Sequence, residues 1–256
     1  MPTLAIANQK GGVGKTTTVI NLGAYLGALG ARVLLIDCDP QANTTSGLGL
    51  RPDGGGLYHV LADGGALVDA IVPTATAGVD LLPATPDLAA AEVELLDADA
   101  PDGLLRAALE PALGRYDFVL LDCPPSLGVL TLNALVAADA VLVPVQCEYL
   151  ALEGLARLMN TLDRIRAKSN PRLRVFGLVM TMYDSRTTLS QQVAEEVRRH
   201  YPTLIFNAVI PRSVRLSEAP SFGTPILQYD PQSRGALAYR DLAQEVASRA
   251  APFHSL

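Results

Sequence analysis

Short apolar segments alternate with longer amphipathic stretches along most of this 256-residue chain. Several apolar segments are unbroken runs of Val, Leu and Ile, which is typical of parallel strands covered on both faces. The alternation predicts an α/β fold with a doubly wound, mostly parallel sheet flanked by helices. The expected strands are Thr3–Asn8, Arg32–Asp37, Val79–Pro83, Phe118–Asp122, Ala140–Val145, Arg174–Thr181 and Leu204–Ile210, and the expected helices are Lys15–Leu29, Thr85–Asp97, Leu127–Ala138, Glu148–Lys168, Thr187–His200 and Gly235–Ala250.

Composition limits the class of protein. An apolar fraction of 49% is enough for a sizeable core, and we expect one domain over residues 1–256. No apolar run reaches the length of a membrane-spanning helix, and the first strand begins too early for a signal peptide. Cys38, Cys123 and Cys147 lack the spacing of a zinc site or a disulfide framework. We therefore expect a cytoplasmic protein with no membrane partner.

Charge is distributed unevenly between the two halves of the chain. Residues 1–150 hold 6 Lys/Arg against 17 Asp/Glu, a net charge of −11, whereas residues 151–256 hold 14 against 9, a net charge of +5. A basic half on an acidic protein is compatible with a local surface for a polyanion, and equally with solvated arginines on helix surfaces.

A glycine-rich segment, Gln9–Thr17, directly follows the first expected strand. Such a loop wraps backbone N–H groups around phosphates, adds the Lys15 ammonium and leaves the Thr16 hydroxyl for Mg²⁺. The segment carries a second lysine, Lys10, and has Gln9 where the usual phosphate-loop pattern has glycine. We expect ATP, with Mg²⁺, to contact Lys10, Gly11, Gly12, Val13, Gly14, Lys15, Thr16 and Thr17.

Two further strand ends carry aspartates. The run Phe118–Leu121 ends in Asp122, which has the form of a Walker B carboxylate that holds Mg²⁺ through water, with Thr16 as the other protein ligand. Asp39 follows the strand that ends at Asp37 and is the candidate for positioning the attacking water. Lys10, Lys15 and Asp39 are thus the expected catalytic residues, although aspartates at strand ends also serve as helix caps and turn formers.

The two-lysine loop KGGVGKTT resembles the deviant Walker A loop of the ParA/MinD family of ATPases. Four further segments are similar to the chromosomal ParA proteins often called Soj. They are DCDPQANTTSGLG (Asp37–Gly49), DCPPSLG (Asp122–Gly128), PVQCEYLALEGL (Pro144–Leu155) and IPRSVRLSEAPSFGTPI (Ile210–Ile226).

This resemblance implies a P-loop NTPase that forms a sandwich homodimer with ATP, binds double-stranded DNA non-specifically and hydrolyses ATP when stimulated by a ParB/Spo0J-type protein. It implies that Lys10 reaches the nucleotide of the other subunit and that Asp39 acts in catalysis. It also places the base near the strand end Thr181-Met182 and the Pro211-Arg212 loop. It assigns DNA contacts to Arg186 and Arg215, so that the protein is expected to be nucleoid-associated. The alternative for the two arginines is solvation or internal ion pairing.

Two other functions remain open. A MinD-like positioning ATPase would bind membranes through a basic C-terminal helix, but Ala247–Leu256 has one arginine and a proline break. A P-loop ligase or kinase of the dethiobiotin synthetase-like type would need a small-molecule acceptor. Because the first strand begins at residue 3, we expect no N-terminal helix-turn-helix region and no sequence-specific autorepression.

Overall fold

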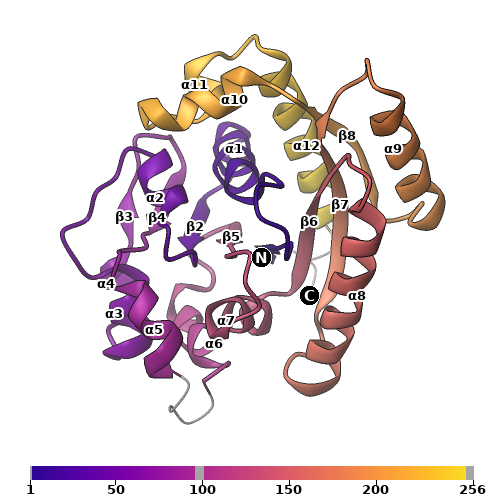
Figure 1. Cartoon of the computed structure of the whole chain (residues 1–256). Coiled ribbons are helices and arrows are strands. Elements are labelled where there is room, and N and C mark those ends of the chain that lie inside the picture. Colours follow the sequence, from indigo (N-terminus) through magenta and orange to yellow (C-terminus); the bar gives the residue numbers. More distant parts are fainter. Residues whose placement is uncertain (1, 96–100, 252–256) are drawn as a thin grey trace.

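The computed structural model describes residues 2–95 and 101–251, and its strands form one eight-stranded sheet (Figure 1). The strand order is β3-β4-β2-β5-β1-β6-β7-β8, and within the described chain only the β3–β4 pair is antiparallel. The strands are β1 (Thr3–Ile6), β2 (Val33–Asp37), β3 (Val72–Pro73), β4 (Val79–Leu82), β5 (Phe118–Asp122), β6 (Ala140–Gln146), β7 (Arg174–Tyr183) and β8 (Ile205–Pro211).

Helices cover both faces of this sheet, as a doubly wound fold requires (Figure 1). The α-helices are α1 (Lys15–Ala28), α2 (Asn43–Gly47), α3 (Gly56–Ala62), α4 (Leu67–Ala70), α5 (Leu88–Glu94), α6 (Leu104–Leu109), α7 (Val129–Ala137), α8 (Ala151–Lys168), α9 (Thr188–His200), α10 (Val214–Glu218), α11 (Ile226–Tyr229) and α12 (Arg234–Ala250), and two 3₁₀ turns are η2 (Glu110–Ala112) and η3 (Ala219–Phe222).

Alternation along the strands divides the core into two layers. In β1, Leu4 and Ile6 pack into the layer beneath α1 and α12, whereas Ala5 packs into the layer beneath α7 and α8. All four residues of β1 are buried, because this strand lies between β5 and β6 near the middle of the sheet. Burial on both faces explains why the strands read as unbroken apolar runs.

The α/β, doubly wound, mostly parallel fold predicted from the sequence is confirmed, and all seven expected strands and six expected helices are present. The helix α5 is shorter than expected, since it covers Leu88–Glu94 instead of Thr85–Asp97, of which residues 96 and 97 lie outside the described residues. The helices α7 and α8 also begin two and three residues later than expected. The sequence reading missed β3 and the short helices, since elements of two to seven residues show too little periodicity. The glycine-rich segment Arg51–Gly56 leads into α3, and its last residue, Gly56, is buried and begins that helix.

Across residues 2–95 and 101–251, no helix combines the length and apolar character needed to span a membrane.

Candidate active site

The glycine-rich loop connects the central strand β1 to α1, and two of its glycines make the connection possible. Gly12 and Gly14 have φ angles of 74° and 91°, in the left-handed region that side-chain-bearing residues rarely adopt. The Thr181 hydroxyl at the end of β7 donates a 2.8 Å hydrogen bond to the Val13 carbonyl, which ties the loop to the sheet. The 14-residue helix α1 therefore begins at Lys15 with its positive N-terminal end at the loop.

The two lysines of the loop occupy different environments. Lys15 is only 7% exposed, and its Nζ donates a 3.1 Å hydrogen bond to the Lys10 carbonyl within the loop. Burial lowers the pKa of Lys15, while the nearby Asp122 carboxylate acts in the opposite direction. Lys10 is exposed and forms an ion pair with Glu148, just before α8. Lys15 is thus poised inside the loop, and Lys10 is held at its rim.

Two buried carboxyls lie side by side at the ends of β2 and β5. Asp37 is the register partner of Asp122. Asp37 accepts hydrogen bonds from the Thr45 amide at 2.9 Å and hydroxyl at 2.7 Å, and Asp122 accepts one from the Thr44 hydroxyl at 2.7 Å. Burial raises the pKa of Asp37 to about 6 and that of Asp122 to about 7. The helix α2 is therefore anchored to the strand ends through both carboxyls.

One oxygen of this pair suits a metal ion. Asp122 Oδ1 is buried and has no hydrogen-bond partner, and the nearby Thr16 side chain lowers the pKa of the same carboxyl. An unpartnered buried carboxylate oxygen is costly, and a hard oxygen ligand is what Mg²⁺ prefers. No three His, Cys, Asp or Glu side chains of the described chain gather into a metal-binding cluster. Thr16 and Asp122 are accordingly the protein groups that fit a Mg²⁺ ion retaining several waters.

Asp39 lies in the turn between β2 and α2. Its side chain is only 7% exposed, and Oδ1 accepts a 2.9 Å hydrogen bond from the Gln41 amide. No group of the described residues hydrogen-bonds its other oxygen, Oδ2. The turn continues through Ala42, whose φ of 51° is unusual for a residue with a side chain. Asp39 thus combines a fixed backbone with one carboxylate oxygen available to water.

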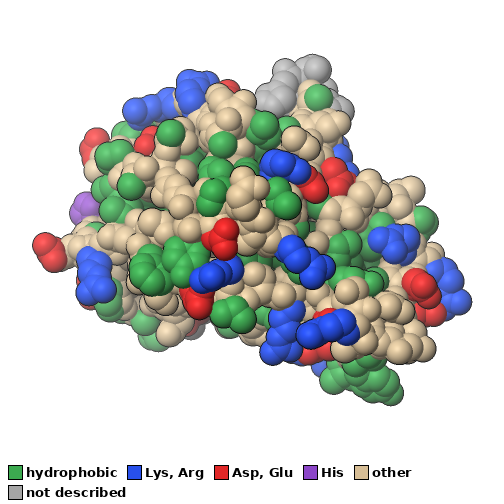
Figure 2. All heavy atoms as spheres, turned by 90° about the horizontal axis from the view of Figure 1, so that it is seen from above, with side chains coloured by type: hydrophobic (Ala, Val, Ile, Leu, Met, Phe, Trp, Pro, Cys, Tyr) green, Lys and Arg blue, Asp and Glu red, His purple; other side chains and the backbone are tan. Residues whose placement is uncertain are grey.

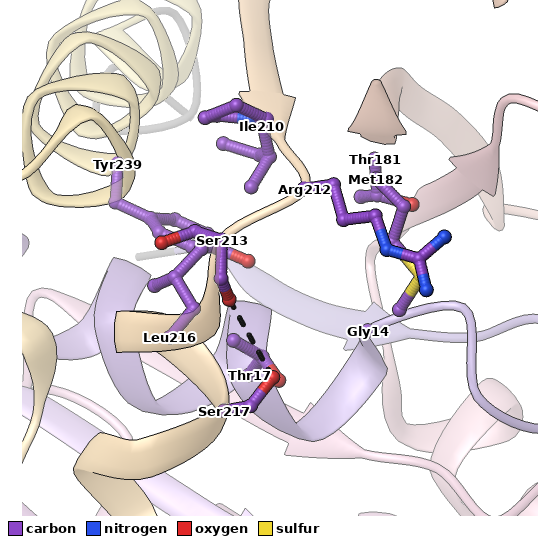
Figure 3. A pocket seen from close by; sticks show the side chains of 11 residues that line it. Gly14, Thr17, Thr181, Met182, Ile210, Arg212, Ser213, Leu216, Ser217 and Tyr239 are labelled. Carbon is purple, nitrogen blue, oxygen red and sulfur yellow. Dashed lines mark hydrogen bonds between the residues drawn. The ribbon is translucent and has the colours of Figure 1, made fainter. Parts of the chain in front are cut away.

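A cavity of about 170 Å³ opens beside the loop, and Figure 3 shows the side chains around it. It brings together Met182 and Pro211, the two residues expected near the base, with Gly14 and Thr17 of the loop and helix. Met182, the last residue but one of β7, has a left-handed φ of 51°, which is unusual for a residue with a side chain. The remaining lining residues are Thr181, Ile210, Arg212, Ser213, Leu216, Ser217 and Tyr239.

Tyr239 was not found by sequence reasoning, because it lies on α12 and carries no motif. Its hydroxyl shares a 3.1 Å hydrogen bond with Thr18 of α1, so the tertiary fold alone brings it to the cavity. Arg212, by contrast, belongs with Pro211 to the loop that the family resemblance placed near the base, and it lines the cavity.

Arg186 and Arg215, the arginines expected to contact DNA, are both engaged in ion pairs. Arg186 is 86% exposed and donates to both carboxylate oxygens of Asp184, at 2.9 and 2.7 Å. Arg215 lies 3.0 Å from Glu218 and 3.4 Å from Asp230. Internal ion pairing, the alternative left open by the sequence, describes these contacts, and a role in DNA binding stays a prediction.

Comparison with known proteins extends over nearly the whole chain. A family model described as "AAA domain" matches residues 1–175. The chain is 56% identical to the chromosome partitioning protein ParA of Caulobacter vibrioides, covering 96% of this chain and 94% of that protein. It is 58% identical to the chromosome-partitioning ATPase Soj of Thermus thermophilus, covering 96% and 95%.

A solved structure is similar over the same length. Cobyrinic acid a,c-diamide synthase from Mycobacterium smegmatis with bound ADP and magnesium has a TM-score of 0.84 and 42% identity, covering 96% of this chain and 94% of that one. The chain therefore belongs to the ParA/Soj family of chromosome-partitioning ATPases.

Proposed function

We propose that this ATPase partitions DNA: ATP and Mg²⁺ drive a sandwich homodimer that binds double-stranded DNA without sequence specificity, and a ParB-type partner stimulates the hydrolysis that resets it. The observation that carries the nucleotide site is the buried Lys15 ammonium next to the unpartnered Asp122 oxygen. The proposed location is cytoplasmic and nucleoid-associated.

The phosphates fit the loop by charge and by geometry. Lys15 and the N-terminus of α1 supply positive charge where the β- and γ-phosphates would lie. When bound, Mg²⁺ neutralises charge on the phosphate oxygens, and Thr16 with Asp122 would hold it. Asp122 must lose its proton to do so, which the raised pKa makes dependent on pH near neutrality.

Asp39 and Lys10 complete the proposed hydrolytic site. Phosphoryl transfer depends mainly on positioning and electrostatic stabilisation, and Asp39 Oδ2 is the oxygen that would orient the attacking water. Lys10 would leave its ion pair with Glu148 to reach the phosphates bound by the other subunit. The cavity walled by Met182, Pro211 and Leu216 would receive the adenine, because apolar side chains suit a planar base.

A small-molecule ligase is the second candidate. One neighbour, 42% identical to this chain, is named cobyrinic acid a,c-diamide synthase, and such an enzyme needs an acceptor for its reaction. The two functions differ in what accelerates ATP turnover, since a partitioning ATPase responds to DNA and a protein partner.

The deciding experiment measures ATP hydrolysis by the purified chain alone, with plasmid DNA, and with DNA plus the N-terminal peptide of a ParB-type protein. We expect slow basal turnover that rises with DNA and rises further with the peptide. Anionic phospholipid vesicles in place of DNA test the MinD-like alternative. Turnover indifferent to DNA and peptide would contradict the proposal, and stimulation by vesicles alone would favour membrane positioning.

A further inference from the structure

A cleft lies where β7 and β8 end and α12 begins, and we call it the basic cleft. Three guanidinium groups and a single carboxylate line it, which leaves a local excess of positive charge. Figure 2, which views the molecule from above, shows Lys and Arg side chains on this face, with Asp and Glu side chains interspersed among them. The cleft is lined by Tyr183, Asp184, Ser185, Arg186, Pro211, Arg212, Val214 and Arg234.

The three arginines of the basic cleft differ in their engagement. Arg186 is held by Asp184 through two hydrogen bonds. The side chains of Arg212 and Arg234 are exposed, and neither forms a hydrogen bond or an ion pair within 4.0 Å with any part of the chain that the structure describes. The hydrogen bonds of Arg186 lower the pKa of Asp184, and the charge of Arg212 adds to this effect from a greater distance. These two guanidinium groups can therefore bind an external anion without first breaking an internal ion pair.

Arg212 and Arg234, the two arginines without an ion pair, are both held in place by hydrogen-bonded backbone. The Arg212 amide donates a 3.0 Å hydrogen bond to the Tyr183 carbonyl, at the point where β7 pairs with β8. Arg234 is the first residue of the 17-residue helix α12, whose N-terminus is capped by Ser233 accepting a hydrogen bond from the Ala236 amide. The positive end of α12 adds to the attraction for an anion.

We propose that the basic cleft binds a phosphodiester group of the DNA backbone through Arg212 and Arg234. In this proposal Asp184 competes with the phosphate for the Arg186 guanidinium, and so holds Arg186 away from the DNA. This inference rests on the proposed DNA-binding function and names the residues that serve it. Guanidinium groups bind phosphate oxygens with good geometry and read no base, which suits non-specific binding. The exposed Val214 side chain at the rim, 72% exposed, offers an apolar contact to the sugar.

The cleft also shares a wall with the cavity proposed for adenine. Pro211 and Arg212 line both, so this short segment separates the two sites. A nucleotide bound in the cavity would therefore contact the same short segment that lines the basic cleft. The basic cleft is thus placed to respond to nucleotide binding.

The test measures the affinity of the ATP-bound protein for a random-sequence DNA duplex, as a function of salt, by fluorescence anisotropy. Arg234→Ala and Arg212→Ala should each weaken binding and flatten the plot of log affinity against log salt. The slope should change by about 0.9 for each phosphate that the variant no longer neutralises, and by nearly two when both subunits carry the substitution. Asp184→Asn, which keeps the oxygen that accepts the Arg186 amide, should strengthen binding.

Arg198→Ala is the matched control, because Arg198 is an exposed arginine of α9 that lies outside the cleft. All variants are compared at equal dimer concentration, established by light scattering, since Arg212 also lines the adenine cavity. Inorganic phosphate is added in a parallel series. Competition by phosphate at millimolar concentration, with no loss of DNA affinity in the variants, would identify a free-anion site and overturn the proposal.

The outcomes separate this inference from the function on which it rests. If the parental dimer does not bind DNA at all, the proposed function fails. If the parent binds DNA while Arg234→Ala and Arg212→Ala keep its affinity and salt slope, the basic cleft is not the DNA-binding surface and the proposed function stands.

Discussion

Four charged side chains, those of Lys15, Asp37, Asp39 and Asp122, are buried at the centre of this site. Lys15 and Asp122 were predicted from the sequence to hold phosphate and metal, whereas the role of Asp37 was not. The structure shows Asp37 binding the amide and hydroxyl of Thr45, which fixes α2 to the end of β2. A buried charge is costly unless it is paired, so this cluster favours a bound cation and polyanion over an empty site.

The first prediction concerns the pH dependence of stability in the nucleotide-free protein. Asp37 and Asp122 have pKa values raised from 3.8 to about 6 and about 7. At pH values between 3.8 and these raised pKa values, the folded state therefore binds more protons than the unfolded state. Stability should therefore fall as pH rises from about 4 to about 7, and change little from this source below pH 3.8. Thermal melts across this range measure it.

Asp122→Asn is the comparison for this prediction, because it removes one titrating group and keeps the shape. Its fall in melting temperature over the same range should be smaller, and it should lose the stabilisation that Mg²⁺ with ATP gives the parent. If the variant keeps the pH profile of the parent, the assignment of the raised pKa to Asp122 is wrong.

The second prediction concerns Lys15→Ala, which should abolish ATP binding. The charge-assisted hydrogen bond of its ammonium to phosphate contributes about 1.5–3 kcal/mol, and the loop has no other buried cation to replace it among the residues described. Isothermal titration calorimetry with ATP and Mg²⁺ measures the effect. Lys168→Ala, at the exposed end of α8, is the control and should bind ATP as the parent does. Parental affinity in Lys15→Ala would remove the phosphate-loop interpretation.

The third prediction separates Lys10 from Lys15. Lys10→Ala should keep most of its ATP affinity, because its ammonium contacts Glu148 and not the inside of the loop. It should lose ATP-dependent dimerisation if the side chain acts across the subunit interface. Light scattering with and without ATP decides this, and a normal ATP-dependent dimer would exclude the cross-subunit role.

At the scale of elements, α12 protects an edge of the sheet. The strand β8 pairs only with β7 in the described sheet, so its outer edge would otherwise present unpaired backbone groups. Glu245 of α12 accepts hydrogen bonds from the amides of Asn207 and Ala208, at 2.9 and 2.6 Å. Arg249 donates to the Ile205 carbonyl at 2.8 Å and to the Leu204 carbonyl at 3.1 Å, which also accepts a hydrogen bond from the Leu178 amide of β7. Side chains of one helix thus satisfy several backbone groups along β8.

The fourth prediction tests this arrangement. Glu245→Ala should lower the free energy of unfolding by about 1–3 kcal/mol, because two strand amides lose their charged acceptor. Urea denaturation measures the change. Glu195→Ala, an exposed glutamate of α9, is the control and should change stability by no more than about 0.5 kcal/mol. Equal effects of the two substitutions would show that the hydrogen bonds of Glu245 contribute nothing specific.

At the scale of the whole molecule, the sheet joins the two halves of the chain. The acidic half supplies the buried carboxyls, and the basic half supplies most of the adenine cavity and the basic cleft. Asp37 and Asp122 come from β2 and β5, whereas Met182 and Pro211 come from the ends of β7 and β8. The phosphate loop lies between them, because β1 is central in the strand order. This placement would allow hydrolysis at the loop to be coupled to the proposed DNA surface.

The fifth prediction concerns that coupling. Asp39→Ala should bind ATP and dimerise but turn ATP over slowly, because water orientation is lost while the loop is unchanged. Its dimer should then remain on DNA for longer than the parental dimer, as measured by dissociation from a DNA-coated surface. Turnover within about twofold of the parent, roughly 0.4 kcal/mol in the barrier, would exclude Asp39 from this role.

Much of the fold and part of the site were predictable from local patterns. Unbroken apolar runs indicated buried parallel strands, and the glycine and lysine spacing indicated a phosphate loop, because both signals lie within a few consecutive residues. The short helices α2 and α10 were not predictable, since short helices depend on distant residues, as α2 does on Asp37 and Asp122.

The sequence by itself determined the fold class, the phosphate loop and the aspartates at the strand ends, because the order of residues along one strand and its turn decides them. Only the tertiary structure decided that Asp122 Oδ1 has no partner, that Tyr239 reaches the cavity and that, within the described chain, Arg212 and Arg234 are unpaired. Burial and ion pairing depend on residues far apart in the chain, such as Arg215 with Asp230, and their distances exist only once the sheet has assembled.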